Sequence, residues 1–170
     1  MKSMKYVALS AFLTLSAFCA VLYSSCTKDE CKGVTCLNGG TCSGGTCTCP
    51  TGYEGTSCET ESRTKFVKSW SATDVIGTTT LSYVVNISSG GSTDVTKVVI
   101  GNAFSDDFFV IGPITANVTG NTINIPLQNP DHNKYSLTGT GTIAAGKITW
   151  SYTIKNDSTS ATQVYSASWM

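Results

Sequence analysis

Residues 31–58 read CKGVTCLNGGTCSGGTCTCPTGYEGTSC. They hold six of the eight cysteines of the 170-residue chain, and no cysteine follows them. Such a density predicts a disulfide framework in an oxidising compartment, because so short a segment cannot bury enough apolar surface to stay folded alone. Six cysteines can pair in many ways, and their spacing alone does not choose among these.

Metal binding is the competing interpretation of this cysteine cluster. Structural zinc prefers paired Cys-x₂₋₄-Cys knuckles and a reducing compartment, so we expect no metal. Calcium is not expected either, because Asp29 and Glu30 alone offer too few oxygen ligands for an ion that takes about six to eight. We expect no cofactor.

The segment resembles an EGF-like domain. Residues 36–42 (CLNGGTC) match the CxNGGTC segment of that family, and residues 47–58 (CTCPTGYEGTSC) match its CxCxxGYxGxxC ending. The resemblance covers residues 31–58 and marks them as an EGF-like domain, a type of module that serves as a rigid spacer or contact surface. It implies the disulfides Cys31–Cys42, Cys36–Cys47 and Cys49–Cys58.

The N-terminal segment has the layout of a secretory signal peptide. Lys2 and Lys5 precede residues 6–23, which are uncharged and mostly apolar. A retained membrane span is the alternative, since the stretch is about long enough to cross a bilayer, but no basic cluster follows it. We therefore expect residues 1–25 to be a signal peptide that is removed.

The sequence at the expected cleavage site indicates a lipid anchor. Residues 22–26 (LYSSC) resemble the lipobox of bacterial lipoproteins, in the loose form found in the Bacteroidota. The resemblance implies that Cys26 carries a diacylglyceryl thioether and further acyl mass such as palmitate. Two or more chains would hold the protein stably, at about 0.8 kcal/mol per buried CH₂. The alternative is an ordinary signal peptide that leaves Cys26 as a free thiol.

Residues 26–30 would then form a lipidated tether. Within it, Lys28, Asp29 and Glu30 resemble the export signal that sends Bacteroidota lipoproteins to the outer face of the outer membrane. The resemblance implies a protein anchored in the outer membrane and facing the cell exterior. The alternative is a short solvated linker on a periplasm-facing anchor.

Residues 65–170, beyond a polar connector at 59–64, show the period-two alternation of β-strands. The clearest case is 148–154, where Ile148, Trp150, Tyr152 and Ile154 share one face. Short turns are expected at 89–92, 119–121 and 145–146. The predicted strands are 65–73, 79–88, 95–102, 108–118, 122–127, 135–144, 147–155 and 162–169.

The fold class is therefore mostly β: a small disulfide-rich, EGF-like module followed by an antiparallel β meander. Eight short-linked strands favour closure into an eight-stranded barrel, which hides the sheet edges, and a two-sheet sandwich is the alternative. Gly139 and Gly141 are expected where the barrel wall bends sharply.

The β region also carries a resemblance, on residues 65–67, 70–71, 94–97 and 120–126. These runs are similar to a β domain found behind single EGF-like modules in Bacteroidota lipoproteins, and the region is more loosely similar to small lipocalin-like barrels. The first of these resemblances implies no activity.

Composition and motifs argue against two classes of function. Acidic and basic residues balance at 11 each, with no basic stripe, so a nucleic-acid binder is not expected. His132 is the only histidine, and Asp106 and Asp107 suit a solvated turn better than a paired-carboxylate site. With no nucleotide or catalytic motif present, we expect a protein that is not an enzyme, and a monomer.

Two functions remain. The first is a surface-exposed, lipid-anchored interaction or adhesion module for an unknown protein or glycan partner. The alternative is a lipocalin-like carrier of a small apolar ligand, with Trp70, Trp150, Tyr152 and Trp169 lining the cavity. A cavity above roughly 300 Å³ would favour the carrier, and a filled interior would favour the interaction module.

One candidate modification site stands apart from these functions. Residues 157–159 (DST) match the D-[S/T]-x acceptor pattern for O-glycosylation known from the Bacteroidota, with Ser158 as the acceptor.

Overall fold

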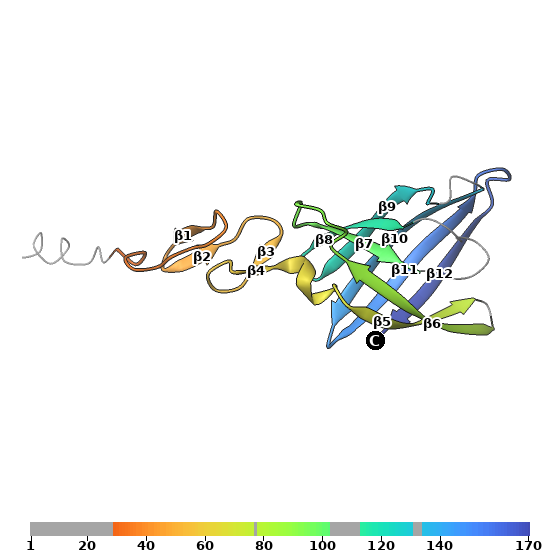
Figure 1. The fold of residues 1–170 in the computed structure, drawn as a ribbon, viewed down its shortest axis with the longest axis horizontal. Helices are drawn as coiled ribbons and strands as arrows, with labels where there is room; N and C mark the ends of the chain where they lie inside the picture. The colour runs from red at the N-terminus through yellow and green to blue at the C-terminus, as the bar shows by residue number, and fades with distance from the viewer. Residues whose placement is uncertain (1–28, 77, 103–112, 131–133) are drawn as a thin grey trace, which may run out of the picture.

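A computed structural model describes residues 29–76, 78–102, 113–130 and 134–170 of the chain (Figure 1). It shows a disulfide-rich module followed by a closed antiparallel β-barrel, as predicted. In the described part no helix is long and apolar enough to cross a membrane.

The disulfide module is built on two short hairpins. β1 (Thr41–Ser43) pairs with β2 (Thr46–Thr48), and β3 (Tyr53–Glu54) pairs with β4 (Thr60–Glu61). Gly44 and Gly45 turn the first hairpin with φ values of +57° and +76°, a conformation that disfavours residues with a side chain.

All six cysteines of the module are engaged in disulfides, so the zinc interpretation is wrong. The bonds join Cys31 to Cys42, Cys36 to Cys47 and Cys49 to Cys58, the pairing that the resemblance implied. Each closes a loop of about ten residues, worth on the order of 3 kcal/mol in the chain-entropy model.

Eight strands form the barrel. In chain order they are β5 (Ser69–Ile76), β6 (Thr79–Ser88), β7 (Lys97–Gly101), β8 (Ile114–Thr119), β9 (Thr122–Gln128), β10 (Tyr135–Ala144), β11 (Lys147–Asn156) and β12 (Thr162–Trp169). Neighbours in sequence pair as a meander, and β12 pairs with β5 to close the sheet. The sandwich alternative is therefore wrong, because the closed ring removes the edges that two separate sheets would leave.

Two predicted strands begin earlier than the real ones. The first begins at Ser69 rather than at residue 65, because a 3₁₀ helix, η1 (Ser62–Lys65), precedes it. The third begins at Lys97 rather than at residue 95, because Asp94 accepts hydrogen bonds from the amide and hydroxyl of Thr96 and holds a turn there. Of the prediction 108–118, the part before residue 113 lies outside the described residues.

Alternation along the strands directs apolar side chains into the barrel. The pattern is clear in β8, where Ile114, Ala116 and Val118 are buried and the residues between them are exposed. Three tryptophans are the largest side chains of this interior, and each is at most 1% exposed.

Gly139 and Gly141 of β10 lie where the predicted irregularity occurs. The register between β9 and β10 shifts between Leu137 and Gly139. Gly141 faces Trp150 across the β10–β11 pair, and a Cβ there would lie 2.7 Å from the Trp150 ring. The glycines therefore leave room for the large side chains of β11, and the predicted sharp bend of the wall stays a prediction.

Candidate functional site

The barrel has two ends with different surroundings. The proximal end carries η1, the loop 89–96 and the hairpin turns at 120–121 and 145–146, and the disulfide module adjoins it (Figure 1). The distal end carries the end of β9, the start of β10 and the β11–β12 loop, and Figure 1 shows it pointing away from the module. The described residues include a polar cluster at the first end and a pocket at the second.

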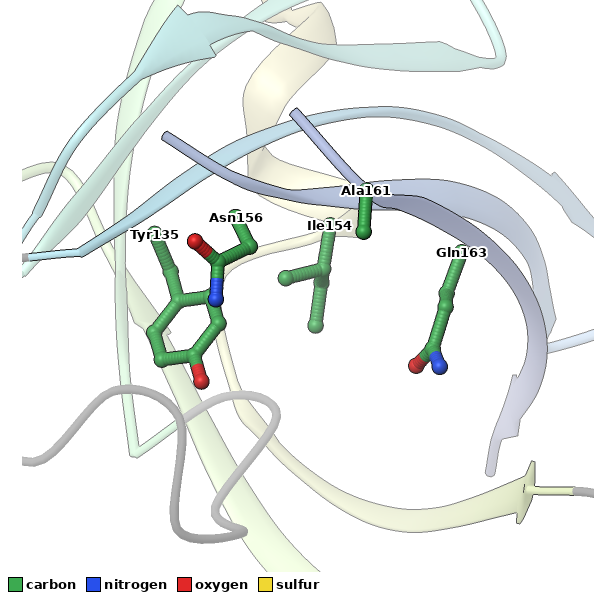
Figure 2. Close-up of a pocket in the computed structure, with 5 residues that line it drawn as sticks. All are labelled: Tyr135, Ile154, Asn156, Ala161 and Gln163. Atoms are coloured by element: carbon green, nitrogen blue, oxygen red, sulfur yellow. The ribbon is translucent and has the colours of Figure 1, made fainter. Parts of the chain in front are cut away.

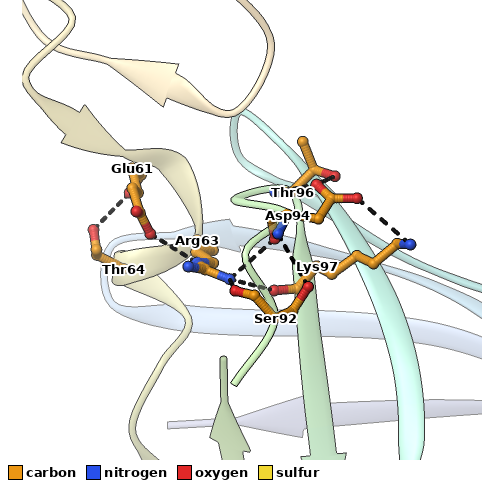
Figure 3. Close-up of polar contacts among 7 residues, drawn as sticks. All are labelled: Glu61, Arg63, Thr64, Ser92, Asp94, Thr96 and Lys97. Atoms are coloured by element: carbon orange, nitrogen blue, oxygen red, sulfur yellow. Dashed lines mark hydrogen bonds and ion pairs between the residues drawn. The ribbon is translucent and has the colours of Figure 1, made fainter. Parts of the chain in front are cut away.

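Arg63 is the centre of the proximal cluster (Figure 3). Its side chain is only 10% exposed, and its Nη1 donates hydrogen bonds to the backbone oxygens of Ser92 (3.2 Å), Asp94 (3.0 Å) and Lys97 (3.1 Å). Its Nε donates to the Glu61 carboxylate at 2.7 Å. One guanidinium thus ties the β6–β7 loop of the barrel to β4 of the module, a use of its rigid fork that lysine cannot copy.

Further contacts join the module to the barrel on either side of Arg63. The Lys65 ammonium donates to Glu54 of β3 at 2.6 Å and to Asn121 of the β8–β9 turn at 2.8 Å. A Cβ at Gly52 would lie 2.6 Å from the Val95 side chain, so the module backbone touches the β6–β7 loop directly. The connector 59–64 is therefore part of a packed junction.

Asp94 stabilises the β6–β7 loop, whose carbonyls accept hydrogen bonds from Arg63. Hydrogen bonds from the Thr96 hydroxyl, and then from the Thr96 amide, lower the pKa of the Asp94 carboxyl below its ordinary value of 3.8, and Lys97 adds to this in the same direction. The effect belongs to an exposed group and is modest. The folded loop thus favours the ionised carboxylate.

Because folding lowers this pKa, Asp94 contributes stability above the ordinary pKa of 3.8, and that stability is lost as the pH falls through the folded-state value. Asp94→Asn is therefore expected to lower the melting temperature at pH 7 and to differ less from the wild type near pH 3. Thermal unfolding across this range checks it. Thr96→Val, which removes the first cause of the shift, should reproduce part of the change, and a pH-independent gap between Asp94→Asn and the wild type would contradict the assignment.

The four residues predicted to line a ligand cavity lie inside the barrel, but they pack against protein. Trp150 contacts Trp169 with ring centroids 4.7 Å apart, and the Trp70 Nε1 donates to the Phe66 carbonyl at 2.8 Å. Tyr152 stacks on Tyr165 at 5.1 Å. The tryptophans therefore fill the proximal half of the barrel.

Asp74 is a buried interior group that the sequence reasoning missed. It is 2% exposed, and its Oδ2 accepts hydrogen bonds from the hydroxyls of Tyr83 (2.7 Å) and Tyr152 (3.0 Å). Its spacing from Trp70 and Ala72, at intervals of two, was the available signal for an inward-facing carboxylate. Tyr152 is thereby a structural partner of Asp74.

The distal pocket has a volume of about 170 Å³. Its lining residues come from β10, β11, β12 and the β11–β12 loop, and Figure 2 shows them around the mouth of the barrel: Tyr135, Ile154, Asn156, Ala161 and Gln163. None of the four predicted cavity residues is among them. The pocket combines an aromatic ring, two side-chain amides and a small apolar surface.

Ser158, the candidate glycosylation site, is exposed in the β11–β12 loop beside this pocket. Cys26, the expected lipid site, lies outside the described residues, as do His132, Asp106 and Asp107. Within the described ranges no group of three or more His, Cys, Asp or Glu residues could hold a metal ion.

Comparison with protein-family models and with curated proteins finds no match to this chain. The arrangement of the two ends of the barrel is therefore the basis for a functional proposal.

Proposed function

We propose that the chain is a lipid-anchored binding module of the bacterial cell surface, without catalytic activity. In this proposal the EGF-like module is a rigid stalk and the barrel is a head that presents its distal end to a protein or glycan partner. The anchor is Cys26, in the outer leaflet of the outer membrane.

The junction around Arg63 is the observation that carries this proposal. A spacer is useful for display only if it holds its head in a set orientation, and four hydrogen bonds from one buried guanidinium serve that purpose. Cys31 follows Cys26 by five positions, so the stalk would begin within about 17 Å of the lipid. The distal pocket would then face away from the membrane.

The interior of the barrel supports this function over the carrier. Pockets that enclose a drug-sized ligand measure roughly 300–1,000 Å³. The distal pocket has a volume of about 170 Å³, and the three tryptophans are buried in the barrel interior on its proximal side. A carrier of apolar ligands would need that space.

The anchor is tested by Cys26→Ser, expressed in a host of the Bacteroidota. The wild-type protein should partition into the detergent phase of a Triton X-114 extraction and carry acyl mass on Cys26 in mass spectrometry, because acyl chains supply the membrane affinity. Cys26→Ser should lack that acyl mass, and Cys19→Ser is the matched control that should keep it, since Cys19 lies in the expected signal peptide. A wild-type protein whose intact mass shows no acyl groups would refute the anchor.

Display is tested separately on intact cells. An antibody to the barrel should label wild-type cells. Replacing Lys28, Asp29 and Glu30 by alanine should abolish labelling while leaving the protein in the detergent phase. Equal labelling of both strains would contradict the role of these residues in export.

A further inference from the structure

We propose that the distal pocket binds a terminal N-acetylhexosamine, a neutral sugar with an acetamido group, at the end of a glycan. This inference deepens the proposed function, since it names the ligand class that the head would recognise. It rests on the size of the pocket, on the oriented amide donor of Asn156 and on the apolar surface beside it.

The size and openness of the pocket suit one end of a larger molecule. Its volume of about 170 Å³ corresponds to roughly six water molecules, taking about 30 Å³ for each. Ala161 and Gln163 on its wall are exposed, so the pocket opens to solvent. A single sugar residue can enter while the rest of the glycan stays outside.

Asn156 supplies the oriented donor. Its Oδ1 accepts hydrogen bonds from the backbone amides of Ser158 (3.0 Å) and Thr159 (3.1 Å) in the β11–β12 loop. These two donors require oxygen at that position, so the Nδ2 group takes the other one. Figure 2 shows this nitrogen on the side of Tyr135, toward the interior of the mouth.

Gln163 lines the pocket on the side opposite Asn156 in Figure 2. The Tyr165 hydroxyl donates to Gln163 Oε1, which leaves the Nε2 group to donate elsewhere. Figure 2 shows the Oε1 of Gln163 on the side of Ile154 and its Nε2 on the far side, so the donor at the pocket is the Asn156 Nδ2 group, and a matching ligand must bring it an acceptor oxygen. A carbonyl and a ring of hydroxyls meet that requirement.

The apolar part of the lining complements an acetyl methyl and the C–H face of a sugar ring. Ile154 is 5% exposed and lies between Asn156 and Ala161 in Figure 2, with the Tyr135 ring on the neighbouring strand. No described lining residue carries a charge, which disfavours an ionised ligand that would lose its hydration there. The acetamido group carries a carbonyl acceptor and a methyl on the same carbon. It can therefore accept a hydrogen bond and contact the apolar lining at the same time.

Two isosteric substitutions test the proposal. Asn156→Asp and Gln163→Glu keep the oxygens that accept from Ser158, Thr159 and Tyr165, and they replace each N–H donor by an acceptor. Asn124→Asp, on the exposed face of β9, makes the same charge change away from the pocket. The probes are the methyl β-glycosides of N-acetylglucosamine and N-acetylgalactosamine, with methyl β-glucoside for comparison.

The assay is an NMR titration of the protein purified from its host. We expect at least one N-acetylhexosaminide to bind with a Kd on the order of 1 mM, and methyl β-glucoside about tenfold more weakly or not at all. Asn156→Asp should weaken binding by about tenfold or more, Gln163→Glu should weaken it less, and Asn124→Asp should match the wild type.

Three results would overturn the inference: no binding of either N-acetylhexosaminide, equal binding of methyl β-glucoside, or equal affinities of all variants. Because the assay uses purified protein, it does not depend on anchoring or display. A negative sugar assay would not affect the tests of anchoring and display. A negative anchoring test would likewise not affect the sugar assay.

Discussion

Replacing Arg63 with methionine is expected to destabilise the protein by on the order of 3 kcal/mol and to free the disulfide module from the barrel. The methionine keeps most of the apolar stem but removes the guanidinium. The carbonyls of Ser92, Asp94 and Lys97 and the Glu61 carboxylate would each lose a charged donor. Removing the donor from a buried charged network costs more stability than the intact network adds. The acceptors that remain are still shielded from water, and they have lost their partner.

Urea unfolding followed by tryptophan fluorescence measures the stability, and small-angle scattering measures the loss of a fixed orientation. Lys147→Met is the matched control, since Lys147 is an exposed cation at the proximal end with no side-chain hydrogen bond or ion pair among the described residues. Arg63→Lys should recover only part of the loss, because an ammonium cannot reproduce the geometry of the guanidinium. If Arg63→Met unfolds like Lys147→Met, the junction does not depend on this residue.

Gly141→Ala is expected to destabilise the barrel by about 1–3 kcal/mol, the usual range for overpacking. The added methyl would lie 2.7 Å from the Trp150 ring and 2.9 Å from the Ile123 side chain, both in the packed interior. Thermal unfolding measures the loss of stability, and near-ultraviolet circular dichroism reports on the Trp150–Trp169 pair, whose rings are 4.7 Å apart.

Gly101→Ala is the control for the change of residue type. At that position the nearest atom to a new Cβ is the Asn86 carbonyl oxygen, 3.8 Å away, so the substitution should be neutral or slightly stabilising. Combining Gly141→Ala with Ile123→Ala should show a favourable coupling, since the second change removes one of the clashing groups. Equal effects of the two glycine substitutions would mean that the close approach at Gly141 does not matter.

Local patterns predicted much of the fold. The burial of Ile148, Trp150, Tyr152 and Ile154 follows from their alternation, because side chains two residues apart share a face of any strand. The turn at 145–146 follows from its residues: Ala145 and Gly146 adopt φ values of +49° and +75°, and a glycine lowers the cost of such a turn.

The limits of these patterns appear at the junction. Residues 59–64 are polar and read as a connector, yet Ser62 and Arg63 are buried. The carbonyl partners of Arg63 lie about 30 positions further on, in the loop after β6. Nothing within the connector indicates that the Arg63 guanidinium will donate hydrogen bonds to three distant carbonyls, so the junction could not be predicted from local sequence.

The sequence by itself determined the disulfide-rich module, the strands of the barrel and the inward face of 148–154, because cysteine density, alternation and turn residues act over a few positions. Only the tertiary structure decided that the barrel closes, that the tryptophans fill its proximal half, and that Tyr135, Asn156 and Gln163 meet at its distal mouth. The physical reason is register: the stagger between neighbouring strands decides which inward side chains share a level, and that stagger results from packing across the whole ring.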